Sequence, residues 1–326
     1  MIINYDFSKR LNKFEKHFGI RDFTNSQYLI IKRECKSAPL GLMAYYITNL
    51  AWIEYAVRNH IIPVIDMKNY YNAFHRDGEV GKINTWEYFF EQPALISLEE
   101  ALESGKARYV WNDIPEYQPN ESLDFLMNSE IVEYYREIAA KYILFKPEIQ
   151  KELKAENERI LDPAKNRRIL GVLARGTDYV SLKPDYHPIQ PNVEQMICQI
   201  DYYRKLFECD KIYVATEDAG ILETMKNIYG EDLLYSSQKR IYPSEFFLND
   251  DPEFNQRSPF ERGMEYLQSI YTLAQCNGII AGRTSGTVGA VLMARNYEFQ
   301  YIFSLGRYGV EDKILADKEK VNEEDI

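Results

Sequence analysis

The residues best suited to chemistry lie in the stretch 169–191, where Arg-Gly-Thr-Asp follows an apolar run and a His-Pro pair comes later. An apolar run that ends in glycine and polar residues predicts a buried strand leading into a loop. Ligands bind at the carboxyl ends of such strands in open α/β sheets, so Arg175 is expected at a binding edge. The planar cation of arginine suits phosphate recognition. Two interpretations are open: Arg175 binds a phosphate, or it pairs with Asp178 and holds the loop closed.

A second candidate segment, A-G-R-T-S-G-T-V-G-A at residues 281–290, follows an expected strand and opens an expected helix. Backbone N–H groups at a helix N-terminus bind anions, and glycine lets a phosphate approach closely. Ser285 and Thr287 would add hydroxyl donors. The segment matches neither the Walker pattern nor G-x-G-x-x-G, so an ordinary helix cap with close glycine packing is the alternative.

Acidic residues and a histidine complete the ionisable candidates. Glu217 and Asp218 follow another expected strand. Adjacent carboxylates can bind a metal or ribose hydroxyls, or they can cap the next helix, and we favour the cap for at least one of them. His187 can exchange a proton near neutral pH, although a loop histidine more often forms a local hydrogen bond.

An alternation of strands and helices must position these residues. In the first half, residues 27–32 and 61–66 read as strands with a helix at 42–60 between them. Strand, helix and strand in this order predict a parallel sheet. The second half repeats the pattern. Its strands are expected at 169–174, 211–215, around 233, 278–281 and 299–303, and its helices at 191–207, 219–229, 259–275 and 284–294.

The domain boundary is expected inside the charged, largely helical region 128–157. The break at Lys146-Pro147 is expected to kink this region, because proline lacks an amide donor and crowds the preceding turn. The sequence therefore predicts an α/β protein of two Rossmann-like domains, an N-terminal one over residues 1–150 and a C-terminal one over residues 151–326.

Composition narrows the class of protein. A chain of 326 residues is long enough for two cores. The net charge of −11 argues against broad nucleic-acid binding, which needs a basic surface. The four cysteines form no C-x-x-C pair and predict neither a zinc site nor disulfides. No segment approaches the roughly 20 apolar residues that span a bilayer, and no secretory signal is recognised. We expect a cytoplasmic protein and leave peripheral membrane contact open.

Three blocks of the second half resemble a known enzyme family. G-V-L-A-R-G-T-D at 171–178, with His187-Pro188 downstream, resembles the family block G-V-H-V-R-R-T-D followed by H-P. A-T-E-D-A at 215–219 resembles A-T-D-D-P. A-Q-C-N at 274–277 and R-T-S-G at 283–286 resemble S-Q-A-D and F-S-S-Q. This family comprises the α-1,6-fucosyltransferases and the nodulation fucosyltransferases, and it is related to the protein O-fucosyltransferases.

The resemblance implies a glycosyltransferase-B-like fold and inverting transfer from GDP-fucose, without a required metal or cofactor. It implies that Arg175 contacts the donor pyrophosphate and that Ser285 lies on the same phosphates. Sequences of this kind resemble bacterial enzymes of capsule or lipopolysaccharide synthesis.

Several family positions differ in this sequence. The second arginine of the first motif is Gly176, and the histidine two residues before the first arginine is Leu173. The proposed base of the α-1,6 enzymes aligns with Lys183. The aspartate that reads guanine aligns near Ser269, with Glu265 one helical turn earlier as a substitute. These departures put GDP-fucose specificity more in doubt than nucleotide-sugar transfer, and they leave the base unassigned.

We therefore predict a glycosyltransferase that moves a sugar from a nucleotide-sugar donor, with GDP-fucose favoured, to a glycan acceptor bound on the side of the first domain. The catalytic candidates are Arg175, Asp178, Asp185 and His187. The donor-binding candidates are Arg175, Glu265, Ser269, Arg283, Thr284, Ser285, Gly286 and Thr287. The alternatives are a catalytically silent nucleotide- or sugar-binding protein and another enzyme on a similar scaffold, such as a polysaccharide pyruvyl transferase.

Overall fold

The computed structural model describes residues 27–34, 40–111, 118–164, 167–244, 246, 248 and 251–310. The chain forms two compact units, each built from separate segments. The first contains the described residues up to Asn120, with Phe125–Leu153 and Pro259–Met264, and the second contains Glu121–Asp124, Lys154–Ser258 and the described residues from Glu265. The sequence predicts one division of the chain, after residue 150, whereas each unit combines segments that are separate in the sequence. The acceptor and donor roles of the two domains stay predictions.

The first unit contains a three-stranded parallel sheet. Its strands β1 (Tyr28–Lys32), β2 (Ile62–Ile65) and β3 (Ala107–Trp111) lie in the order β2-β1-β3. The almost wholly buried helix α2 (Leu42–Arg58) connects β1 to β2, as the sequence predicts. Strand β3 was not predicted. It lies at the sheet edge with Arg108 and Tyr109 exposed, so it lacks the apolar alternation that reveals a half-buried strand.

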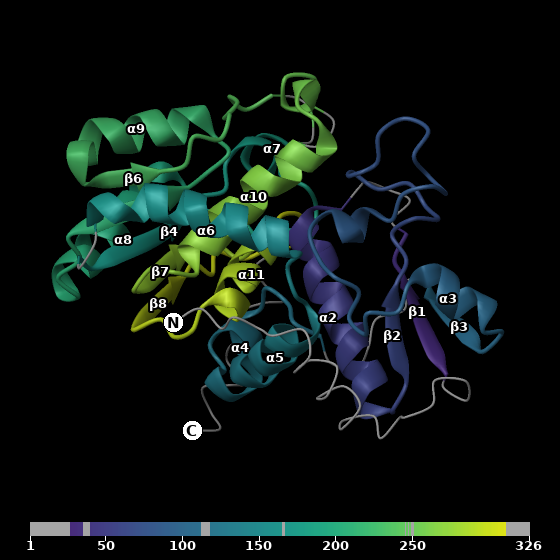
Figure 1. Ribbon diagram of the computed structural model, residues 1–326. Helices are drawn as coiled ribbons and strands as arrows, with labels where there is room; N and C mark the ends of the chain where they lie inside the picture. Colours follow the sequence, from purple (N-terminus) through teal and green to yellow (C-terminus); the bar gives the residue numbers. More distant parts are fainter. Residues whose placement is uncertain are drawn as a thin grey trace. The chain divides into compact units, whose positions relative to one another are not determined.

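The second unit contains a five-stranded parallel sheet in the order β6-β5-β4-β7-β8 (Figure 1). The strands are β4 (Ile169–Leu173), β5 (Lys211–Ala215), β6 (Leu233–Tyr235), β7 (Gly278–Ala281) and β8 (Phe299–Ile302). The helices that alternate with them are α8 (Val193–Leu206), α9 (Ala219–Tyr229), α10 (Pro259–Leu273) and α11 (Ser285–Met293). This Rossmann-like arrangement confirms the α/β fold class predicted from the sequence.

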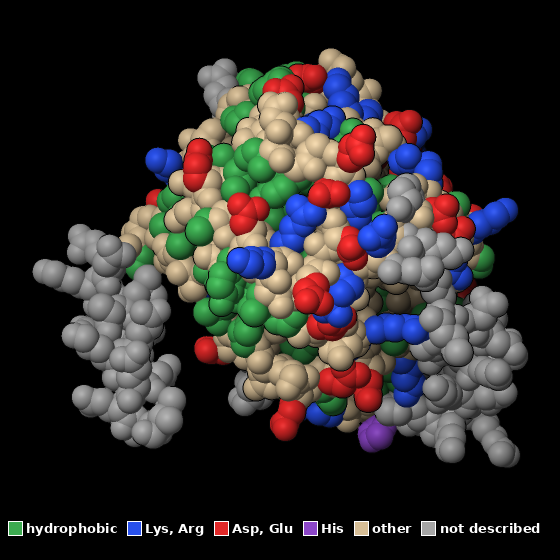
Figure 2. Space-filling view, turned by 90° about the vertical axis from the view of Figure 1, so that its left-hand side faces the viewer, with side chains coloured by type: hydrophobic (Ala, Val, Ile, Leu, Met, Phe, Trp, Pro, Cys, Tyr) green, Lys and Arg blue, Asp and Glu red, His purple; other side chains and the backbone are tan. Residues whose placement is uncertain are grey.

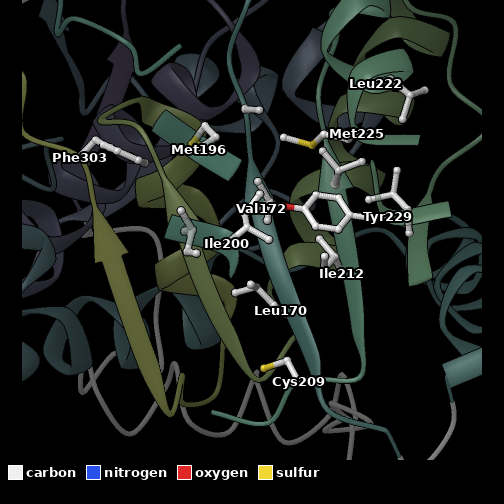
Figure 3. Close-up of a cluster of buried hydrophobic side chains, with 14 of the residues drawn as sticks. Leu170, Val172, Met196, Ile200, Cys209, Ile212, Leu222, Met225, Tyr229 and Phe303 are labelled. Carbon is white, nitrogen blue, oxygen red and sulfur yellow. The ribbon is translucent and has the colours of Figure 1, made fainter. Parts of the chain in front are cut away.

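A hydrophobic core binds α8 and α9 to one face of the second sheet (Figure 3). Leu170 and Val172 of β4 meet Met196 of α8 and Met225 of α9 in this cluster. Alternate residues point to the opposite face, where a Cβ on Gly171 would meet Cys276 after α10. Strands buried on both faces read as continuous apolar runs, which explains why this sheet is visible in the sequence.

The remaining helices are α3 (Leu98–Glu103), α4 (Leu123–Leu126), α5 (Ser129–Tyr142), α6 (Pro147–Leu161) and α7 (Thr177–Ser181). Short 3₁₀ helices cover Thr85–Tyr88, Asp162–Ala164, Gly230–Asp232 and Phe254–Gln256. Pro147 begins a new helix rather than kinking a longer one, because a proline ring is tolerated in the first turn, where its missing N–H would have no partner.

No helix of the described residues is long and apolar enough to cross a membrane. On the face drawn in Figure 2, cationic and anionic side chains are interspersed with apolar ones.

Candidate functional site

The candidate residues follow strands that end level with one another at one edge of the second sheet. Leu173 of β4 pairs in register with Ala215 of β5 and with Ala281 of β7. Because parallel strands present their carboxyl ends at the same edge, the loops 174–176, 216–218 and 282–284 leave the sheet beside one another.

Arg175 is held at this edge by an ion pair and an aromatic ring. Its side chain is only 19% exposed, and its Nη1 lies 3.5 Å from Glu217 Oε1. The guanidinium also lies over the Tyr179 ring, 4.9 Å from the ring centre, and the His187 ring meets Tyr179 edge-on at 5.4 Å. These contacts orient the Arg175 guanidinium at the sheet edge. The Asp178 side chain lies outside the described residues, so its pairing with Arg175 stays a prediction.

The two carboxylates after β5 have different tasks. Asp218 is the N-cap of α9 and accepts from the Ile221 N–H at 3.0 Å, as predicted for at least one of the pair. Glu217 Oε1 accepts from the Gly176 N–H at 2.9 Å and from the Thr177 hydroxyl at 3.0 Å. Glu217 therefore shapes the loop that carries Arg175. In the part of the chain that the structure describes, no group of three or more His, Cys, Asp or Glu residues could hold a metal ion.

Close packing against Asp218 restricts the size of the side chain at position 176. A Cβ at Gly176 would lie 2.7 Å from Asp218 Cβ and 2.8 Å from its Cγ, closer than side chains can approach. The next residue, Thr177, has a φ of +42°. This left-handed conformation is unfavourable for a β-branched residue, and hydrogen bonds to Glu217 and Asp218 hold it there. With Asp218 in this position, only glycine fits at 176.

Three hydroxyl side chains lie at the start of α11, and two of them have partners within the protein. Thr284 is the N-cap and accepts from the Thr287 N–H at 3.1 Å. The fully buried Thr287 hydroxyl donates to the Gly282 carbonyl at 2.5 Å. By contrast, no partner among the described residues satisfies the half-buried Ser285 hydroxyl or the N–H groups of Ser285 and Gly286. Of these candidates, Ser285 and the first two N–H groups are therefore free to bind a ligand.

We expect Thr287→Val to lower the free energy of unfolding by about 1–2 kcal/mol, because it removes a buried hydroxyl that satisfies the Gly282 carbonyl. Ser285→Ala should change it by less than about 0.5 kcal/mol. Chemical denaturation of both variants measures the difference. Equal effects on stability would contradict this division into a structural and a ligand-facing hydroxyl.

The Arg283 side chain contacts Glu121. Its Nε donates to the Glu121 carbonyl at 2.8 Å, and Arg307 donates to the Glu121 carboxylate at 3.0 Å. Burial, with the nearby positive charge of Arg307 as a further cause, lowers the pKa of Arg283 from its ordinary value.

The two candidates for reading the nucleobase both have internal partners. The buried Ser269 hydroxyl lies within hydrogen-bond distance of two acceptors, the side-chain oxygen of Gln238 and, at 3.1 Å, the Glu265 carbonyl. The Gln238 side-chain amide in turn donates to the Thr216 carbonyl at 3.0 Å. The Glu265 carboxylate forms an ion pair with Arg257. A nucleobase contact at Glu265 would have to share that carboxylate with Arg257.

The candidate bases Asp185 and His187 lie on an exposed loop that bridges to Arg307. The His187 Nδ1 lies 3.1 Å from the Asp185 carbonyl, so the loop orients its ring locally. The Asp185 side chain faces the turn at Gly309. His187 and Arg175 both contact the Tyr179 ring, and the base stays unassigned.

Tyr266 of α10 is a neighbour of the site that sequence reasoning missed. A Cβ on Gly286 would lie 2.7 Å from the Tyr266 hydroxyl, so this hydroxyl rests against the start of α11. Burial raises the pKa of Tyr266, and Arg175 and Glu217 are close enough to influence that pKa in opposite directions. One tyrosine among 26 in the middle of a helix gives no functional signal.

The chain matches known proteins in its structure but not in its sequence. No protein-family model matches the sequence, and no curated protein matches it significantly. Among solved structures, NodZ α-1,6-fucosyltransferase soaked with GDP-fucose matches with a TM-score of 0.53 and 17% identity, over 87% of this chain and 98% of that chain. NodZ from Bradyrhizobium matches with a TM-score of 0.54 and 16% identity, over 88% and 98%. A mutant of FUT1 from Arabidopsis thaliana in complex with GDP matches with a TM-score of 0.50 and 10% identity, over 90% and 78%.

The chain therefore has the glycosyltransferase-B fold of these fucosyltransferases. This agreement confirms the fold that the three sequence blocks implied. Identities of 10–17% show the fold alone.

Proposed function

We propose that this protein is a glycosyltransferase that moves a sugar from a nucleotide-sugar donor to a glycan acceptor, and that GDP-fucose is the favoured donor. The observation that carries the proposal is the placement of Arg175 after β4, level with the uncapped N–H groups of Ser285 and Gly286 after the adjacent strand β7. A fixed cation beside free N–H groups at a helix N-terminus suits a diphosphate. Among the solved structures with this fold, one of NodZ α-1,6-fucosyltransferase was co-crystallized with GDP and another was soaked with GDP-fucose.

The proposed reaction needs no covalent intermediate. An acceptor hydroxyl attacks the anomeric carbon, the bond from that carbon to the phosphate oxygen breaks, and the configuration inverts. The nucleoside diphosphate leaves with the electron pair, and Arg175 with the N–H groups of α11 stabilises its charge. The proton of the acceptor passes to a base. Asp178, Asp185 and His187 remain the candidates for that base.

The wider context of the reaction is part of the same proposal. The first unit would contribute the acceptor side, and the glycan would belong to a bacterial capsule or lipopolysaccharide made in the cytoplasm, with peripheral membrane contact left open. A catalytically silent nucleotide- or sugar-binding protein is the second candidate, because Ser269 and Glu265 have internal partners where the family reads guanine.

A thermal-shift screen with GDP-, UDP-, dTDP- and CMP-sugars tests the donor, since a ligand that binds only the native state raises the melting temperature. We expect GDP-fucose to give the largest shift, followed by transfer to a glycan in a product assay. Binding without transfer or hydrolysis would favour the silent protein. A screen in which no nucleotide sugar changes the melting temperature would refute the proposed function.

Transfer should persist in excess EDTA, because Arg175 and the α11 N–H groups supply the positive potential that a metal supplies in other transferases. The measurement is the rate of sugar transfer before and after chelation. A rate that disappears in EDTA and returns with Mg²⁺ or Mn²⁺ would count against this mechanism.

A further inference from the structure

The hydroxyl of Tyr266 occupies the space in front of the second residue of α11. A Cβ on Gly286 would lie 2.7 Å from this hydroxyl, 3.3 Å from Ile270 Cδ1 and 3.4 Å from Leu173 Cδ2. The hydroxyl is the only one of these three atoms inside the range that real Cβ contacts avoid. Glycine at position 286 therefore allows the Tyr266 hydroxyl to reach the helix N-terminus.

This hydroxyl has no hydrogen-bond partner among the residues that the structure describes, although the side chain is only partly exposed. A partly buried phenol usually finds a partner. The groups beside it are donors without acceptors, namely the Ser285 hydroxyl and the N–H groups of Ser285 and Gly286. An anion, which accepts several hydrogen bonds, would satisfy these unpaired donors together.

The electrostatic surroundings keep Tyr266 a neutral donor. Burial raises the pKa of Tyr266, which favours the protonated phenol. Arg175 acts on the same group, so Tyr266 lies between the Arg175 loop and the start of α11. An O–H group can donate to a phosphate oxygen without adding charge to the site.

We propose that the Tyr266 hydroxyl donates a hydrogen bond to the donor diphosphate, as a third element of the anion site alongside Arg175 and the Ser285–Gly286 N-terminus of α11. This inference rests on the proposed function, since it assigns a further binding residue to the same site. Tyr266 lies on α10, and its hydroxyl contacts the start of α11. A single bound diphosphate would therefore contact the Arg175 loop, the Tyr266 hydroxyl and the start of α11.

The test measures the binding of GDP and of inorganic pyrophosphate to Tyr266→Phe by calorimetry, with thermal denaturation of the ligand-free protein. We expect both ligands to bind about tenfold more weakly, because a hydrogen bond to a charged group is lost. The melting temperature without ligand should stay unchanged, since the hydroxyl has no protein partner to lose. Tyr301→Phe is the matched control, because Tyr301 on β8 packs against Tyr203 and Phe303 in the α8 core, and it should bind like the wild type.

A second pair of variants tests the geometry by itself. Gly286→Ala should lower the melting temperature in the wild-type background. In the Tyr266→Phe background, Gly286→Ala should lower the melting temperature less, because the hydroxyl that would lie 2.7 Å from the new Cβ is absent.

The outcomes separate this inference from the proposed function. If GDP binds the wild type, Arg175→Ala weakens it and Tyr266→Phe does not, only the inference on Tyr266 is overturned. If the wild type binds neither GDP nor pyrophosphate, both are overturned. Weaker binding of both ligands by Tyr266→Phe, with an unchanged melting temperature, supports both.

Discussion

Gly176→Ala should destabilise the protein by roughly 3 kcal/mol, the upper range for adding a buried group to a well-packed site. The new Cβ would overlap Asp218, with 2.7 Å to its Cβ and 2.8 Å to its Cγ. Asp218 cannot simply move, because it caps α9 and also accepts from the Thr177 N–H at 3.2 Å. Urea denaturation measures the loss of stability.

Gly220→Ala provides the matched control, because Gly220 also adjoins Asp218. Its Cβ would lie 3.4 Å from Asp218 Oδ1, an ordinary contact, and it stands in the first turn of α9. Stability should therefore stay level or rise by a few tenths of a kcal/mol, up to about 1 kcal/mol. A stable Gly176→Arg variant, which introduces the arginine of the family block that residues 171–178 resemble, would show that the packing argument is wrong.

Arg175→Ala should weaken GDP binding about tenfold or more and reduce sugar transfer about 10²–10³-fold. The loss in transfer exceeds the loss in binding because the negative charge on the diphosphate grows as the bond to the sugar breaks. The fold should survive, because Glu217 keeps its hydrogen bonds from the Gly176 N–H and the Thr177 hydroxyl. Calorimetry and a transfer assay supply the two numbers, and a thermal melt reports the fold.

Arg168→Ala is the control, because it removes a positive charge at the other end of β4. Arg168 immediately precedes β4, at the amino end, where it pairs with Glu298. Binding and transfer should stay within about twofold of the wild type, since screening by salt weakens charges farther than about 10 Å. Equal losses in both variants would reduce the role of Arg175 to a contribution to net charge. Unchanged GDP affinity in a folded Arg175→Ala variant would remove Arg175 from the site.

The second sheet could be predicted from the sequence nearly residue by residue. The expected strands at 211–215 and 278–281 coincide with β5 and β7, because each is a short apolar run buried on both faces and bounded by polar residues or glycine. The first sheet was only partly visible. Edge strand β3 has exposed side chains, and a pattern method finds strands by what they bury.

The division between sequence and tertiary structure is sharper at the site. Sequence by itself placed Arg175 after a buried strand, Asp218 at a helix start and the Ser285 segment at the next helix, because strand ends and helix caps depend on neighbours a few residues away. Only the tertiary structure decided that Glu217 holds the Gly176 N–H, that Ser269 is engaged by Gln238, and that Tyr266 faces Gly286. These partners are 20–41 residues apart in the chain. Their meeting depends on the register of parallel strands and on loop conformation, which no local pattern encodes.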